Sequence, residues 1–221
     1  MKDKKKLLPI SVVILLSGFI CYFFYGTPWD LFSYKNDFAK YLETKYDNEF
    51  VIKDISFDFF HNGIYHAYAH IMDQPGFTFY VGQNPYTKRI EDSYVSEIWQ
   101  KQAKEELGPI VEKFFPDKIN YSVETIVETN LFNDYEPPIP NYKKHVTADV
   151  GISMNEFDIT NENRNNELDR AYLLLKDLEE KGIKFNLFSI SYKNKVILIQ
   201  PNDIVTINSR EDLEKYLIDY K

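Results

Sequence analysis

The chain has 221 residues and a formal net charge of −8, with 26 basic and 34 acidic residues. This acidity argues against a nucleic-acid-binding protein, because neutralising phosphates requires a basic face. The single cysteine, Cys21, lies in an apolar segment. We therefore expect no disulfide and no thiolate metal site in the remainder of the chain.

A basic segment, residues 1–6, precedes an uncharged apolar run from Leu7 to Tyr25. As a helix with a rise of about 1.5 Å per residue, this run would be roughly 28 Å long, close to the hydrocarbon thickness of a bilayer. We predict a single-pass transmembrane helix over residues 7–25. The lysines before it predict a cytoplasmic amino end in the cell membrane and extracellular carboxyl-terminal domains.

Two processed forms are alternatives to this anchor. A cleaved signal peptide usually ends in small residues, whereas this run ends in bulky aromatic ones. A lipoprotein signal needs a small residue directly before its cysteine, and here Ile20 precedes Cys21. Both observations favour an uncleaved anchor.

The chain from residue 30 to residue 82 is predicted to hold a helix and an antiparallel meander of three strands. Apolar side chains recur at helical spacing over residues 30–46. Alternating apolar residues flank Asn62-Gly63, a dipeptide typical of two-residue hairpin turns. A DQPG turn and the apolar run 77–82 complete the meander.

A long helical pattern follows, with apolar residues from Val95 to Phe114. Gly108-Pro109 should break or kink this helix, and Pro116 should end it. We therefore predict a first α+β domain over residues 30–116, with the order αβββα.

Residues 117–221 are predicted to form a second α+β domain with the order ββαββα. A proline-rich loop at residues 135–142 separates its first two strands. The predicted elements are strands over 119–129 and 145–154, a helix after 161–167, a hairpin of 184–192 and 195–200, and a last helix opened by a capping box of Ser209 and Asp212.

Several segments carry a resemblance to a known family. They are GTPW at 26–29, AKYLETKY at 39–46, the Asn-Gly hairpin and IWQKQAKEEL at 98–107. With the basic start and the single apolar run, they resemble the YfjL-like family of small membrane-anchored proteins of Bacillus and its relatives. The resemblance is clearest over the first 116 residues. It implies an anchored, extracytoplasmic, two-part protein of a Gram-positive bacterium, and it carries over no catalytic residue.

The segment HAYAH contains two histidines, His66 and His70, at the spacing that binds zinc on a helix. On a strand, with a rise of about 3.3 Å per residue, their imidazoles would lie roughly 13 Å apart and could not share an ion. We interpret them as solvent-facing strand residues on the same face as Tyr68. The candidate ligand-binding residues are Tyr65, His66, Tyr68 and His70.

Alternation of faces also indicates which tyrosines lie at the surface, where rings can stack on sugars or peptides. The expected exposed tyrosines are Tyr65, Tyr68, Tyr80, Tyr86, Tyr135 and Tyr142.

The segment DITNENRNNELD at 158–169 resembles a calcium loop only superficially. An EF-hand needs Gly at its sixth position and Glu at its twelfth, and these positions hold Asn163 and Asp169. We interpret the segment as a polar lead-in to a helix, and we expect no metal site and no cofactor.

The sequence predicts an extracytoplasmic binding or interaction module rather than an enzyme, because no catalytic constellation and no GxSxG motif is recognisable. The expected partners are the membrane, through residues 7–25, and a protein or peptide. Two alternatives stay open. One is a cell-wall-directed hydrolase with two carboxylates roughly 5–9.5 Å apart. The other is an accessory protein that binds a cationic peptide through its acidic surface.

Overall fold

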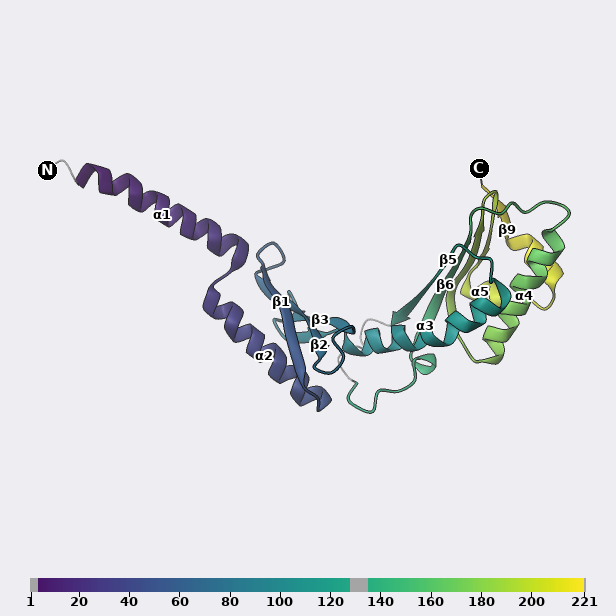
Figure 1. The fold of residues 1–221 in the computed structure, drawn as a ribbon, viewed down its shortest axis with the longest axis horizontal. Helices are drawn as coiled ribbons and strands as arrows, with labels where there is room; N and C mark the ends of the chain where they lie inside the picture. Colours follow the sequence, from purple (N-terminus) through teal and green to yellow (C-terminus); the bar gives the residue numbers. More distant parts are fainter. Residues whose placement is uncertain (1–3, 128–134, 221) are drawn as a thin grey trace. The chain divides into compact units, whose positions relative to one another are not determined.

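The computed structural model describes residues 4–127 and 135–220. The chain forms two compact α+β units (Figure 1). The first extends to Tyr94 and includes the loop residues up to Pro138, and the second begins at Val95 and resumes at Ile139. The boundary that we expected near residue 116 therefore lies at residue 94, so the long helix belongs to the second unit.

The first unit contains two helices and a four-stranded antiparallel sheet with the order β1-β2-β3-β4. Its elements are α1 (Lys4–Tyr25), α2 (Pro28–Tyr46), β1 (Phe50–Asp58), β2 (Ile64–Ile71), β3 (Thr78–Gln83) and β4 (Ile90–Asp92). The predicted helix and three-stranded meander are confirmed. The strand β4 was not predicted, because three residues are too few to show an alternation of apolar and polar side chains.

Local signals explain where these elements begin and end. Thr27 caps α2 by accepting a hydrogen bond from the Asp30 amide at 3.2 Å. Asn62 and Gly63 both have positive φ, of 64° and 59°, and they end the five-residue loop 59–63 between β1 and β2. The hairpin therefore lies where we expected it, but its loop is longer than a two-residue turn.

The core of the first unit lies between α2 and one face of the sheet. α2 contacts β1, and buried side chains come from one stripe of the helix and from alternate strand positions. They include Phe38, Leu42, Tyr46, Phe50, Ile52, Ala67, Ala69, Phe79 and Val81. The other face of the sheet carries mostly polar side chains.

α1 covers the segment for which we expected a membrane span. Within the part of the chain that the structure describes, no helix is both long enough and apolar enough to cross a membrane.

The second unit has a five-stranded mixed sheet with the order β5-β6-β7-β8-β9, in which only β6 and β7 are parallel. The helix α4 connects these two strands. The elements are α3 (Tyr94–Phe114), β5 (Asn120–Val127), η1 (Tyr142–Lys144), β6 (Val146–Met154), α4 (Arg164–Glu180), β7 (Phe185–Tyr192), β8 (Lys195–Ile199), α5 (Pro201–Ile204), η2 (Arg210–Tyr216) and β9 (Leu217–Asp219).

The predicted final helix is wrong in part. The capping box of Ser209 and Asp212 is present, but it opens a 3-10 helix that ends at Tyr216. The following residues, Leu217–Asp219, pair with β8 instead of continuing the helix. Pairing satisfies backbone groups that would otherwise lie unpaired along the edge of β8.

Of the two outcomes that we expected at Gly108-Pro109, a break or a kink, the break is wrong, since Pro109 lies inside α3. Proline inside a helix costs about 3 kcal/mol. Leu107, Ile110 and Val111 are buried around it, and each contributes about 1.5–3 kcal/mol. Burial of this stripe outweighs the lost hydrogen bond, and the helix ends before Pro116 as expected.

Candidate functional site

The four candidate residues of the HAYAH region lie on two different faces of the first sheet. Tyr65 points into the core, where it stacks on Tyr34 at 4.4 Å and donates a hydrogen bond to Asp30 at 3.3 Å. Burial raises the pKa of Tyr65 to about 12. The expectation that Tyr65 is exposed is therefore wrong, because the hairpin register turns it toward α2.

His66, Tyr68 and His70 share the opposite face, as expected for alternate residues of β2. Tyr68 is exposed and His66 is half-buried, but His70 is only 4% exposed, which corrects its interpretation as a solvent-facing residue. The Nδ1 atom of His70 donates to the carbonyl of Ile71 at 2.8 Å. Among the described residues, its Nε2 atom has no hydrogen-bond partner.

Side chains of this face contact one another closely. His66 Nε2 lies 2.8 Å from Ser56 Oγ, and its ring stacks 6.0 Å from that of Tyr80. The hydroxyl of Tyr80 occupies the space over Gly82, where a Cβ atom would lie 2.3 Å from it. The ring of Tyr68 is opposite Tyr80 in register. The polar atoms of His66 and the ring of Tyr80 are thus engaged within the protein, and little of this face remains for a ligand.

The other tyrosines that we expected at the surface differ in how exposed they are. Tyr86 is fully exposed, while Tyr80 and Tyr135 are half-buried. Tyr142 is buried, contrary to the expectation, because it donates to Glu106 of α3 at 3.0 Å. Burial and this carboxylate raise the pKa of Tyr142.

Asp92 is a buried carboxylate that the sequence pattern did not indicate. It accepts hydrogen bonds from the hydroxyls of Tyr41 (2.9 Å) and Tyr46 (2.8 Å), from Lys45 Nζ (2.8 Å) and from the amide of Tyr94 (2.9 Å). Burial and this carboxylate raise the pKa values of Tyr41 and Tyr46. Four donors satisfy Asp92 completely, so the cluster ties α2 to β4 rather than offering a free reactive group.

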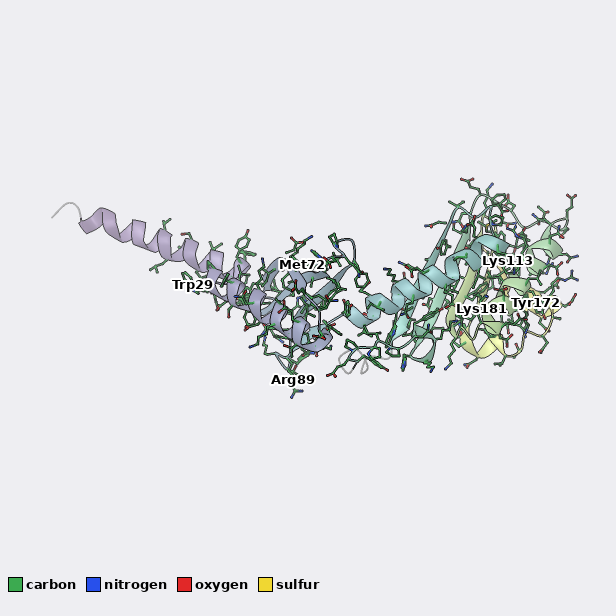
Figure 2. The ribbon with its side chains drawn as sticks, turned by 60° about the horizontal axis from the view of Figure 1, so that its bottom comes forward. Trp29, Met72, Arg89, Lys113, Tyr172 and Lys181 are labelled. Carbon is green, nitrogen blue, oxygen red and sulfur yellow. The ribbon has the colours of Figure 1, made fainter. Side chains whose placement is uncertain are left out.

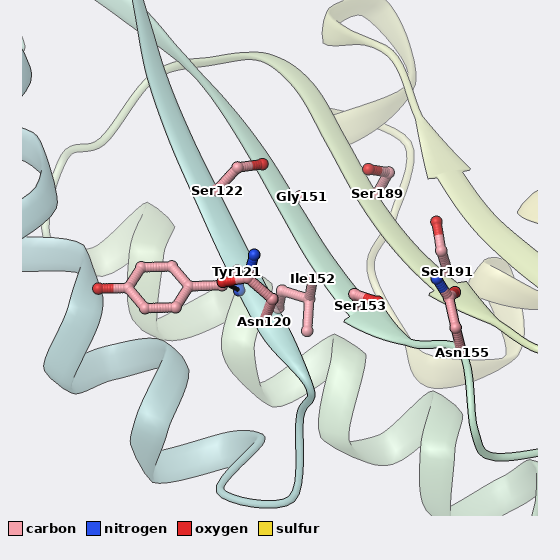
Figure 3. Close-up of a pocket in the computed structure, with 9 residues that line it drawn as sticks. All are labelled: Asn120, Tyr121, Ser122, Gly151, Ile152, Ser153, Asn155, Ser189 and Ser191. Carbon is pink, nitrogen blue, oxygen red and sulfur yellow. Dashed lines mark hydrogen bonds between the residues drawn. The ribbon is translucent and has the colours of Figure 1, made fainter.

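The open face of the second sheet has a different character. Six hydroxyl and amide side chains gather on β5, β6, β7 and the residue after β6, which we call the serine face (Figure 3). Its members are Asn120, Ser122, Ser153, Asn155, Ser189 and Ser191. They border a shallow pocket of about 260 Å³.

Strand register builds the serine face in two rows. Ser122, Gly151 and Ser189 are neighbours across the three strands, and Asn120, Ser153 and Ser191 form the next row. Gly151 leaves a gap between two hydroxyls, since a Cβ there would lie 2.8 Å from Ser122 Oγ.

None of the four serine hydroxyls bonds to another described residue, and no residue that lines the pocket is charged. The ring of Tyr121 points away from the serines, with its hydroxyl against Gly108 of α3 (Figure 3). The face can therefore donate and accept hydrogen bonds, but it has no stacking ring.

A signal for the serine face was present in the sequence. Serine alternates with buried residues in FSISY of β7 and in VGISM of β6. Alternation alone does not show that these strands are neighbours, because α4 lies between them in the chain.

Two carboxylates lie beside the serine face. Glu124 and Asp149 are opposite each other across β5 and β6, and Asp149 also accepts from Asn186 Nδ2 at 3.0 Å. Within residues 4–127 and 135–220, no group of three or more His, Cys, Asp or Glu side chains could hold a metal ion.

The segment that resembles a calcium loop bonds to itself. Asn163 Oδ1 accepts from the amide of Thr160, and Asn163 Nδ2 donates to the carbonyl of Asp158, both at 2.8 Å. α4 begins at the next residue, Arg164, so the interpretation as a helix lead-in is confirmed.

No protein-family model and no curated protein matches this chain. Among solved structures, the chain is similar to the crystal structure of a DUF5037 family protein from Ruminococcus gnavus, with 16% sequence identity and a TM-score of 0.38. The alignment covers 78% of this chain and 77% of that one. A likeness at this level supports no statement about function.

Proposed function

We propose that this protein is a membrane-anchored, extracytoplasmic binding module that holds an uncharged, polyhydroxylated ligand such as a glycan on its serine face. The observation that carries the proposal is the set of four serine hydroxyls, without a partner among the described residues, on three adjacent strands. Hydroxyls of a sugar both donate and accept hydrogen bonds, as do serine and asparagine side chains. A charged ligand would find no side chain of opposite charge among these residues.

The size and composition of the pocket set the expected affinity. At about 260 Å³ it is smaller than most drug-sized sites, so it would hold one sugar unit of a longer chain. Without an aromatic ring to stack on that unit, the interaction depends on hydrogen bonds that compete with water. We expect a dissociation constant in the millimolar range, about −4 kcal/mol.

The anchor is supported by α1. Several of its described apolar side chains, among them Leu15, Leu16, Phe19 and Ile20, are exposed. Burial of these side chains in another apolar medium would be favourable, and the uncharged run of residues 7–25 has the length expected for a bilayer span. The resemblance to the YfjL-like family supports the same placement.

In this proposal the domains lie outside the cell, because the lysines precede the apolar run of residues 7–25. Protease added to intact protoplasts should digest the domains and leave the amino end protected. Full protection of the domains would contradict this topology.

The ligand can be tested by saturation-transfer NMR on the full chain in nanodiscs, with a panel of soluble neutral oligosaccharides. Replacing Ser189 and Ser191 together by Ala should weaken the binding at least fivefold, because two hydrogen-bonding groups are lost. The matched control is Ser33→Ala, an exposed serine on α2. Binding that is equal in both variants, or no binding by the wild type, would contradict the proposal.

The carboxylates Glu124 and Asp149 support a second candidate function, a glycan hydrolase. Directly opposite residues of an antiparallel pair have Cβ atoms about 5 Å apart, within reach of the separation that glycosidases use. Incubation with a bound oligosaccharide distinguishes the two functions. Shortened products that disappear in Glu124→Gln would establish the hydrolase, and an intact ligand would support the binding module.

A further inference from the structure

We infer that the first unit lies against the bilayer surface through an aromatic patch that combines the end of α1, the start of α2 and the β1–β2 hairpin. This inference rests on the proposed membrane anchor. The aromatic patch consists of Tyr25, Trp29, Phe32, Phe59 and Phe60, whose side chains are between 42% and 75% exposed.

Direct ring contacts join the hairpin to the end of α1. The ring of Phe23 lies 3.9 Å from that of Phe59 and 5.5 Å from that of Phe60. One turn of α1 therefore holds the tip of a hairpin that is more than thirty residues later in the chain. The exposed rings of the hairpin therefore lie beside the carboxyl end of α1, where a membrane-spanning helix would leave the bilayer.

The start of α2 adds two more rings to the same end of the unit. Trp29 and Phe32 are three residues apart on α2, so they share one side of the helix. Only Gly26, Thr27 and Pro28 separate α1 from Trp29, which lies beside this junction (Figure 2). Soluble proteins seldom expose so many large rings together without a partner.

Two features favour lipid over protein as this partner. The first is continuity with α1, whose apolar surface would already lie in the bilayer. Tryptophan and tyrosine prefer the headgroup level of membranes, where an apolar ring and a polar edge are both satisfied.

The second feature is charge. Lys88 reaches the hairpin and donates to the carbonyls of Asn62 and Gly63, which places a cation beside the exposed rings, where lipid phosphates lie. The acidic residues nearby are already engaged: Asp30 accepts from Tyr65, and Asp58 bonds to His61 at 2.6 Å.

Tryptophan quenching by lipids with brominated acyl chains tests the patch directly. The full chain is reconstituted in vesicles of phosphatidylcholine and phosphatidylglycerol, with Trp29 replaced by Phe so that only the buried Trp99 remains. A probe is then introduced by Phe60→Trp. Phe60 is exposed, so the substitution does not disturb the core.

Met72→Trp in the same background is the matched control. Met72 is also exposed and belongs to the same unit, but it directly follows the end of β2 that is opposite to the hairpin, roughly 25 Å along the strand. We expect the bromolipid to quench the probe at position 60 at least twofold more than the probe at position 72.

The possible failures are distinguishable. If the protein resists carbonate extraction but both probes are quenched equally or not at all, the patch is overturned and the anchor stands. If carbonate extracts the protein, the proposed anchor itself fails, and the patch with it. If the probe at position 60 is shielded from aqueous iodide without being quenched by lipid, a second copy or another protein covers the rings, which also overturns the inference.

Discussion

The open faces of the two sheets both carry polar side chains, but these side chains differ in whether they bond within the protein. In the first unit, His66 bonds to Ser56 and stacks on Tyr80, and His70 is buried with a bond to the backbone. In the second unit, the hydroxyls of Ser189 and Ser191 have no partner among the described residues. A face that satisfies its own groups stabilises the fold, whereas a face that leaves them free is available for a ligand.

Aromatic and imidazole groups on a strand therefore proved to be a poor guide to which polar side chains lack a partner within the protein. Large side chains reach across to neighbouring strands and bond there. The hydroxyls of Ser122 and Ser189 face Gly151, which has no side chain to bond to them, so they remain open to whatever approaches the sheet. Substitutions and changes of pH should therefore affect the two units differently.

Replacing Asp92 by Ala should destabilise the first unit by about 3–5 kcal/mol, because Lys45 and two tyrosine hydroxyls lose a buried partner. Hydrogen exchange read by mass spectrometry on the full chain in detergent should show faster exchange in α2 and β3, with little change in α4. Glu124→Ala, at an exposed position, is the control. Unchanged protection of α2 would show that this cluster does not hold the unit together.

Alkaline pH should also affect the first unit more strongly, because more of its tyrosines have a raised pKa. They are Tyr41, Tyr46, Tyr65, Tyr80 and Tyr94, whereas in the described part of the second unit they are Tyr142 and Tyr192. The pKa values of Tyr41, Tyr46 and Tyr65 are raised by burial, that of Tyr65 to about 12. A tyrosine whose folded pKa exceeds its unfolded value of about 10 contributes stability that is complete below pH 10 and is lost as the pH rises through the folded pKa. Stability should therefore fall from about pH 10 upward.

Two optical signals test whether the first unit is affected before the second. Tyrosinate absorbance follows the titration, and the fluorescence of buried Trp99 follows the second unit in a Trp29→Phe background. We expect tyrosinate absorbance of the folded protein to lag behind that of urea-unfolded protein, and to rise before Trp99 emission shifts to the red. Simultaneous changes would mean that the two units unfold together.

Two glycines offer a matched pair of substitutions on the open faces. A Cβ on Gly82 would lie 2.8 Å from His66 Cβ and displace the Tyr80 ring, so Gly82→Ala should cost about 1–3 kcal/mol. A Cβ on Gly151 would meet only the hydroxyl of Ser122, which can rotate away, so Gly151→Ala should cost under about 0.5 kcal/mol. Urea unfolding of both variants measures the difference, and equal costs would contradict the contrast between the faces.

The smallest effect concerns the exposed pair of Asp58 and His61. Their hydrogen bond of 2.6 Å holds the pKa of Asp58 below its usual value. The associated stability is present above the unfolded pKa and is lost as the pH falls through the folded pKa. His61→Ala should raise the pKa of Asp58 in an NMR titration, while the thermal midpoint at neutral pH should hardly change, since surface pairs contribute little.

Local signals in the sequence determined much of each unit. The hairpin at Asn62-Gly63 and the capping box of Ser209 and Asp212 both depend on a few adjacent residues, and the structure places both where we expected them. The apolar stripes of α2 and α4 were readable for the same reason, because a helix repeats its buried face every three to four residues.

Only the tertiary structure decided the features that depend on distant residues. These features are the unit boundary at Tyr94, the continuation of α3 through Pro109 and the strand Leu217–Asp219. Each depends on which apolar surfaces are buried together or which strand edges pair. The serine face needs β6 and β7 to be neighbours in one register, although α4 separates them in the chain. Sequence periodicity shows which side of a strand is polar, but strand order shows which polar residues meet.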